Sequence, residues 1–117
     1  MRRGTTPLHK FYVDADMSDV EVLYITYEQN GETVLEKSLD DEGVEVSEAD
    51  KTITVRLSQE ETLLFESEDE SASSALSNVG RSNRVRIQIR WRTTNDCAYA
   101  SDIIVTSVKE ILKDGEI

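Results

Sequence analysis

Hydrophobic and polar residues alternate along most of the chain, which is the pattern of β-strands with one buried face. The clearest example is residues 84–93, where apolar side chains alternate with arginines and glutamine. Residues 20–29 alternate in the same way. Shorter alternating runs predict further strands at residues 8–13, 32–38, 44–46, 52–57 and 98–108.

Turn and cap signals separate these strands. Asn30 and Gly31 supply the two residues with positive φ that a type I′ turn requires, so 20–29 and 32–38 are expected to form a hairpin. Ser58 and Glu61 match a helix capping box. They predict one helical turn crossing between two sheets, with a core side chain just after it: Leu63, Leu64 or Phe65.

About seven strands with a turn signal every 8 to 12 residues are typical of an antiparallel β-sandwich. We therefore predict an all-β, immunoglobulin-like (Ig-like) sandwich that forms a single domain over residues 1–117. The Cys…Trp…Cys spacing of true immunoglobulin domains is absent, so the likeness concerns architecture only. Residues 66–83 are polar, acidic and rich in serine, and they are expected to form a mobile loop or an insertion.

The charge is strongly negative and uneven. The net charge is −11, and residues 32–70 hold fourteen acidic and three basic side chains. Such a balance disfavours nucleic acids and anionic membranes as partners. With no recognisable signal peptide and no membrane-length apolar run, synthesis in a cytoplasm is expected. The single cysteine excludes an intrachain disulfide.

No catalytic constellation can be recognised in the sequence. His9 is the only histidine, and a lone histidine on a strand is usually packed or at the surface. Cys97 follows a turn and does not stand at a helix start, a common setting of reactive cysteines, so we expect a small buried residue. We therefore expect no enzymatic activity and no cofactor.

An acidic turn around Asp14, Asp16 and Asp19 has oxygen ligands that suit a hard cation. The EF-hand pattern fails here, because Asp19 stands where the loop needs glycine and Ile25 where it needs glutamate. A solvated loop between two strands is the better interpretation, and no metal site is predicted.

The most informative polar feature is a row of like charges on one face of residues 84–93, formed by Arg84, Arg86, Arg90 and Arg92. Like charges on one strand face repel unless something compensates them. Nucleic acid is disfavoured, because Trp91 faces the other way and no aromatic platform accompanies the arginines. Two readings stay open: ion pairs with nearby glutamates (candidates Glu21, Glu32 and Glu36), or an interface with an acidic surface of another copy.

Five short segments occur in an order that resembles a known group of proteins: residues 3–7, 25–31, 57–62, 87–90 and 100–103. The group comprises short, poorly characterised proteins encoded in phages and prophages of gut Firmicutes. The resemblance covers most of the chain except residues 66–83. It implies a virion-associated or tail-region structural protein with a sandwich fold, and it carries no catalytic or ligand residues.

Two functions follow as hypotheses. In the first, the chain is a structural or adaptor module of a phage particle, made in the host cytoplasm, whose partners are other virion proteins or copies of itself, with a homo-oligomer expected. In the second, it is a monomeric module that binds a glycan or a host protein through residues 66–83.

Overall fold

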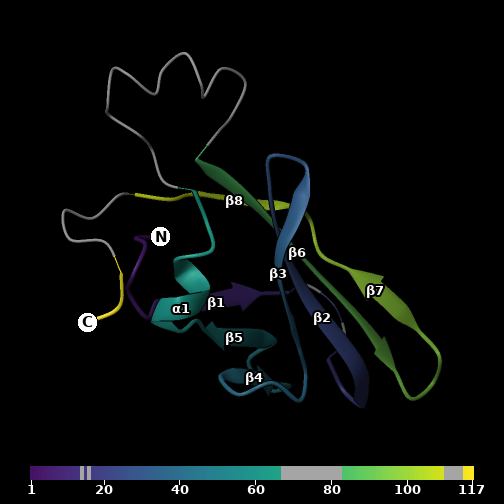
Figure 1. The fold of residues 1–117 in the computed structure, drawn as a ribbon. Coiled ribbons are helices and arrows are strands. Elements are labelled where there is room, and N and C mark those ends of the chain that lie inside the picture. The colour runs from purple at the N-terminus through teal and green to yellow at the C-terminus, as the bar shows by residue number, and fades with distance from the viewer. Residues whose placement is uncertain (14, 16, 67–82, 110–114) are drawn as a thin grey trace.

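The chain folds into two antiparallel β-sheets that pack face to face (Figure 1). The computed structural model describes residues 1–13, 15, 17–66, 83–109 and 115–117. One sheet has the order β1-β5-β4, and the other has the order β3-β2-β6-β7, with β8 also paired to β6. The elements are β1 (Leu8–Tyr12), β2 (Val20–Gln29), β3 (Glu32–Ser38), β4 (Val44–Ser47), β5 (Thr52–Arg56), α1 (Gln59–Thr62), β6 (Arg84–Thr93), β7 (Ala98–Ala100) and β8 (Ile104–Ser107).

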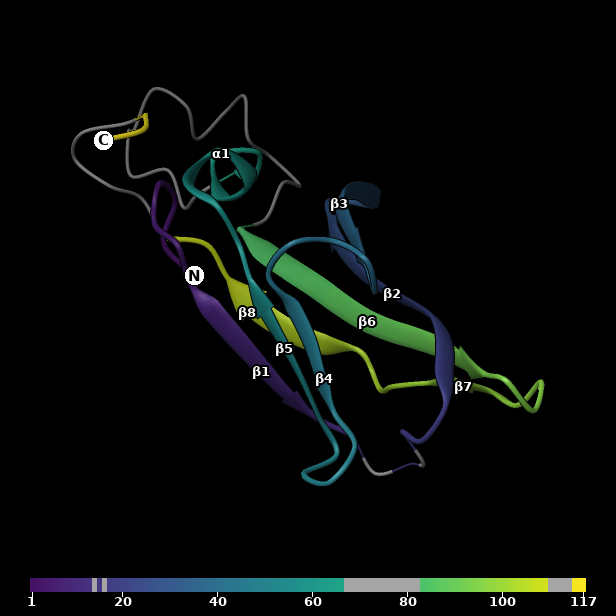
Figure 2. The ribbon, with the colours of Figure 1, turned by 90° about the horizontal axis from the view of Figure 1, so that it is seen from below.

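The strand order is that of an Ig-like sandwich. The order β1-β5-β4 corresponds to strands B, E and D of an immunoglobulin domain, and β3-β2-β6-β7 corresponds to C′, C, F and G. Figure 2 shows the three strands of the first sheet packed over one face of the second sheet. The predicted fold class is confirmed, with eight described strands in place of about seven. In the part of the chain that the structure describes, strand A is represented by a parallel bridge between Arg2 and Lys109.

The core lies between the two inner faces. Alternate residues of β2 and β6 point inward, as period two requires, and they are almost fully buried. Phe11, Ile53 and Val55 meet them from the opposite sheet. Trp91 stacks on Tyr99 of β7, with ring centroids 5.5 Å apart. The inward residues of β2 and β6 are Leu23, Ile25, Tyr27, Val85, Ile87, Ile89 and Trp91.

The predicted hairpin between β2 and β3 is confirmed. Asn30 and Gly31 have φ values of 54° and 80°, as a type I′ turn requires. The predicted capping box is also present: Ser58 Oγ accepts from the Glu61 N–H at 3.1 Å, and Glu61 Oε1 accepts from the Ser58 N–H at 2.9 Å. Phe65 is the core side chain that follows α1, whereas Leu64 is exposed. No helix of the described residues is long and apolar enough to cross a membrane.

The last strand, expected as one element over residues 98–108, is divided into β7 and β8. The register against β6 shifts by one residue between Arg90–Ala100 and Ile87–Ile104. Ser101 lies at the shift, where its backbone N–H donates to the Ile89 carbonyl at 2.8 Å and its hydroxyl accepts from the Ile89 N–H at 3.0 Å. The serine side chain replaces a backbone partner, so the extra residue is accommodated as a bulge.

Gly43, in the turn between β3 and β4, should be intolerant of a side chain. Its φ is +88°, and an added Cβ would lie 2.8 Å from the Arg56 carbonyl oxygen. We expect Gly43→Ala to lower the free energy of unfolding by about 2 kcal/mol or more, because strain and a backbone clash add. Urea denaturation measures the loss.

Gly31→Ala is the matched control for this substitution. Gly31 also has a positive φ, +80°, but nothing lies within 4 Å of an added Cβ. We expect a smaller loss, about 1 kcal/mol, from the backbone conformation alone. Equal losses in the two variants would show that the contact with Arg56 contributes nothing.

Candidate functional site

Strand β6 places the four predicted arginines on the outer face of its sheet. Its inward side chains are buried, so the residues between them point to solvent. Arg84, Arg86, Arg90 and Arg92 are all exposed. We call this outer surface of β2, β6, β7 and β8 the arginine face.

Two of the arginines form ion pairs with glutamates of β2. Arg86 Nη1 lies 2.9 Å from Glu28 Oε1, and Arg92 Nη2 lies 3.4 Å from Glu21 Oε2. Such exposed pairs contribute about 0–1 kcal/mol each. They leave much of each arginine in solvent.

Of the glutamates considered as partners from the sequence, Glu21 is confirmed. The expectation for Glu32 and Glu36 is wrong, because β2 lies between β3 and β6. Glu36 is opposite Thr26 of β2 and accepts a hydrogen bond from its hydroxyl at 3.3 Å. Sequence reasoning missed Glu28, since only the register of β2 against β6 places it opposite Arg86.

Arg90 lies at the middle of the arginine face. Its neighbours across the sheet are Tyr24 of β2 and Ala100 of β7. No acidic side chain of the described residues forms an ion pair with it. It therefore presents an unneutralised guanidinium beside an aromatic ring and a small apolar residue.

Exposed apolar side chains lie on the same face, one beside Arg90 and one beside Arg86. Tyr24 is 46% exposed, and Val105, which lies opposite Arg86 on β8, is 55% exposed. Tyrosine and arginine are enriched in protein–protein interfaces, where the centre is apolar and the rim polar. The alternation of residues 20–29 already placed Tyr24 on one strand face, but only the pairing of β2 with β6 brings it beside Arg90.

His9 belongs to the core side of the sandwich and not to this face. Its Nδ1 lies 2.9 Å from the hydroxyl of the buried Tyr27. Burial, and then the charge of the N-terminus, lower the pKa of His9, while burial and the charge of Glu61 raise the pKa of Tyr27. Both shifts favour neutral groups, so the imidazole and the tyrosine hydroxyl share a hydrogen bond between uncharged partners inside the sandwich.

The prediction that Cys97 is buried is wrong. The residue is exposed in the turn between β6 and β7. Asp96 has a φ of 65°, and the Cys97 carbonyl accepts from the Thr93 N–H at 2.9 Å. The backbone of this residue closes the turn, which leaves its side chain outside the sandwich.

The other sequence candidates are less informative. Asp14 and Asp16 of the acidic turn lie outside the described residues, as do residues 67–82 of the expected loop. Among the described residues, no three histidine, cysteine or acidic side chains gather closely enough to hold a metal ion. Asp19 adopts a positive φ of 57°, and its carbonyl accepts from the Thr94 N–H.

Comparisons with known proteins give a structural likeness and no sequence relative. No protein-family model and no curated protein matches the chain. One solved structure with a similar fold is the V domain of amphioxus IgVJ-C2, with a TM-score of 0.36 and 10% identity, covering 95% of this chain and 97% of that one. The Ig-like assignment therefore rests on the strand order itself.

Proposed function

We propose that the protein is a non-enzymatic structural or adaptor component of a phage virion that works by protein–protein assembly through the arginine face. The observation that carries the proposal is Arg90. It is exposed at the centre of the arginine face, beside Tyr24, and it forms no ion pair with the described residues. An acidic surface of a neighbouring subunit would neutralise it.

The chain itself offers such an acidic surface. The turns on either side of β4, the edge strand of the other sheet, carry exposed acidic side chains. A molecule with a basic face and an acidic edge can associate head to tail, which generates rings or filaments from one repeated contact. The acidic residues are Asp40, Asp41, Glu42, Glu48 and Asp50.

The resemblance to small phage proteins agrees with this assignment, because virion parts are made in the cytoplasm and act in many copies. The partners proposed are copies of the same chain and other virion proteins. Neither nucleic acid nor a membrane is proposed, since the net charge of −11 opposes polyanions.

Arg90→Glu tests the proposal. We expect light scattering to show a discrete oligomer of the native protein at about 0.01 M salt that dissociates near 1 M, where the screening length falls to about 3 Å. Arg90→Glu should be monomeric at both salt concentrations. The matched control is Lys10→Glu, which makes the same charge change on β1 of the other sheet, separated from β4 by β5, and should keep the oligomer.

Two results would contradict the proposal. A strict monomer of the native protein at every concentration and at low salt would exclude self-assembly and favour a monomeric binding module. An oligomer unaffected by Arg90→Glu would remove the arginine face from the contact.

A further inference from the structure

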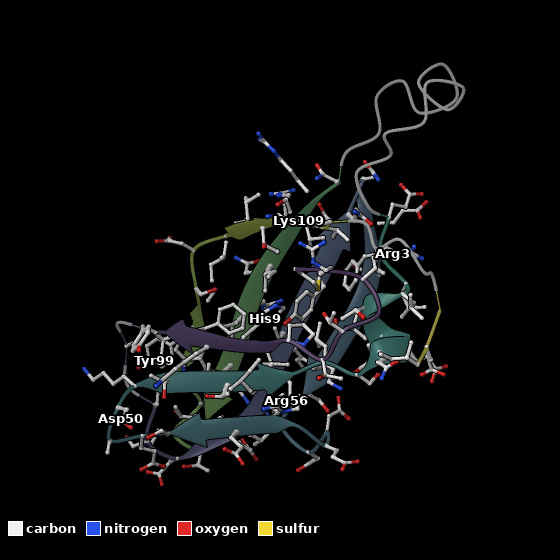
Figure 3. The ribbon with its side chains drawn as sticks, turned by 90° about the vertical axis from the view of Figure 1, so that its left-hand side faces the viewer. Arg3, His9, Asp50, Arg56, Tyr99 and Lys109 are labelled. Carbon is white, nitrogen blue, oxygen red and sulfur yellow. The ribbon has the colours of Figure 1, made fainter. Side chains whose placement is uncertain are left out.

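We propose that the open edge of β1 is a second binding site, which accepts one extended strand of a partner protein with an acidic residue opposite Lys10. The partner strand would add to the sheet β1-β5-β4 and extend it to four strands. This site is independent of the arginine face, because β1 belongs to the other sheet. Figure 3 looks onto β1, with β5 and β4 below it and β8 above it in that view.

Hydrogen bonds around β1 show which of its backbone groups face outward. The Leu57 N–H donates to the Pro7 carbonyl, and the Val13 N–H donates to the Lys51 carbonyl. In an antiparallel pair, residues alternate between bonding the neighbour and pointing away from it. His9 and Phe11 therefore bond to β5, whereas the N–H and C=O groups of Leu8, Lys10 and Tyr12 point to the open edge.

Nothing among the described residues pairs with these groups, since β1 ends its sheet. An open strand edge is a template for another strand, and proteins commonly blunt such edges with charges, prolines or bulges. The outer side chains of β1 contain only one charge, Lys10, between Leu8 and Tyr12, which are 53% and 75% exposed. Addition of a strand at such an edge is a known mode of peptide recognition.

The two sheets differ in width at this side of the sandwich. The sheet β1-β5-β4 is three strands wide, while the other has four positions, because β7 and β8 share one side of β6. The bridge between Arg2 and Lys109 shows that the edges of β1 and β8 lie on the same side. Ile104 of β8 lies opposite the buried Ile87, yet it is 36% exposed. A fourth strand beside β1 would cover part of this apolar surface.

Positive charges along the edge of β1 favour an acidic partner strand. Lys10 makes no ion pair within the described residues, and its Nζ lies 5.5 Å from the centroid of the Tyr12 ring. Arg2, Lys109 and the amino group of Met1 lie together at one end of the same side, where the amino group donates to the Ser107 carbonyl. A strand with an acidic residue at its centre matches this edge, and a basic one does not.

The occupant is a single extended segment and not the edge of a second intact sandwich. An intact copy would bring its own second sheet along with the edge strand. The second sheet of that copy would collide with β7 and β8, which form the edge of the wider sheet beside β6. Only a strand free of its own partner layer fits beside β1.

A tethered strand tests the site at high effective concentration. The sequence Thr-Val-Glu-Val-Thr is fused before Met1 through about eight glycine and serine residues, a flexible linker. Run antiparallel to β1, it places its valines toward the core side and its glutamate opposite Lys10. The matched control has lysine in place of the glutamate, and both fusions are also made with Lys10→Glu.

Amide hydrogen exchange provides a position-specific result. We expect the amides of Leu8, Lys10 and Tyr12 to exchange about tenfold or more slowly in the glutamate fusion than in the lysine fusion. The Lys10→Glu background should reverse the preference. Those of His9 and Phe11, already bonded to β5, should change little.

Three results would overturn the site. They are equal amide exchange in all four proteins, slower exchange that is the same with glutamate or lysine at the centre of the fused strand, and slower exchange at Val105 of β8 in place of the amides of β1. None of them depends on the oligomeric state or on Arg90. Failure here is therefore distinguishable from failure of the proposed function.

Discussion

Replacing Glu61 by alanine is expected to destabilise the protein by about 3–4 kcal/mol. Lys37 is only 8% exposed, on the inner face of β3, and its Nζ lies 2.7 Å from Glu61 Oε2. Without Glu61, a buried ammonium group loses its counter-charge. The capping box of α1 is lost in the same step, because Glu61 also accepts from the Ser58 N–H. Urea denaturation of the variant measures the effect.

Two further variants isolate the cause. Glu60→Ala removes an exposed acid from the same helical turn and should cost less than about 0.5 kcal/mol. Lys37→Met combined with Glu61→Ala removes both charges and should recover most of the loss, since a buried pair can often be replaced by apolar groups. A double variant as unstable as Glu61→Ala would contradict the role of the unpaired ammonium.

The same ion pair gives stability a pH dependence. Burial alone would raise the pKa of Glu61, but the hydrogen bonds from Lys37 and Ser58 and the charge of Lys37 outweigh it and lower the pKa. The folded-state pKa is then below the unfolded value, so this contribution is complete above about pH 4.5 and is lost as the pH falls through the folded-state pKa. Glu61→Ala should flatten this part of the acid unfolding curve.

Phe65→Ala is expected to have an effect of similar or larger size, about 3–5 kcal/mol. Phe65 is 1% exposed, and its ring centroid lies 5.9 Å from that of Tyr27. Truncation leaves a cavity beside the Tyr27 ring, at the point where α1 leads the chain from one sheet to the other. Thermal or urea unfolding with near-ultraviolet circular dichroism follows both the stability and the packing of Tyr27.

Leu64→Ala is the control for this truncation. Leu64 is adjacent in the chain but 55% exposed, so its loss should be below about 1 kcal/mol. A comparable loss in both variants would mean that the segment after α1 contributes through its backbone and not through the Phe65 side chain.

The features predicted well from the sequence are local ones. Period two in residues 20–29 and 84–93 fixes which side chains share a face, and Asn30 with Gly31 fixes a turn, because each depends only on neighbours along the chain. The capping box of Ser58 and Glu61 is equally local.

Features that depend on distant pairing were missed. Nothing local indicates that β2 separates β3 from β6, which decides that Arg86 meets Glu28 and not a glutamate of β3. The hydroxyl of Ser101 divides the last strand only because Ile89 lies beside it. The exposure of Cys97 likewise follows from a turn closed by a backbone bond to Thr93.

The central place of β6 has a consequence for folding during synthesis. β6 pairs with β2, β7 and β8, and its pairing with β2 joins residues about sixty positions apart, such as Glu28 and Arg86. Strands β1 to β5 therefore leave the ribosome before their core can close, and pairing this distant in sequence is slow. After β6 has emerged, and until it pairs with β2, its arginines act as gatekeepers. They place like charges opposite one another in any in-register pairing of two nascent chains, and so oppose aggregation through the apolar residues of the same strand.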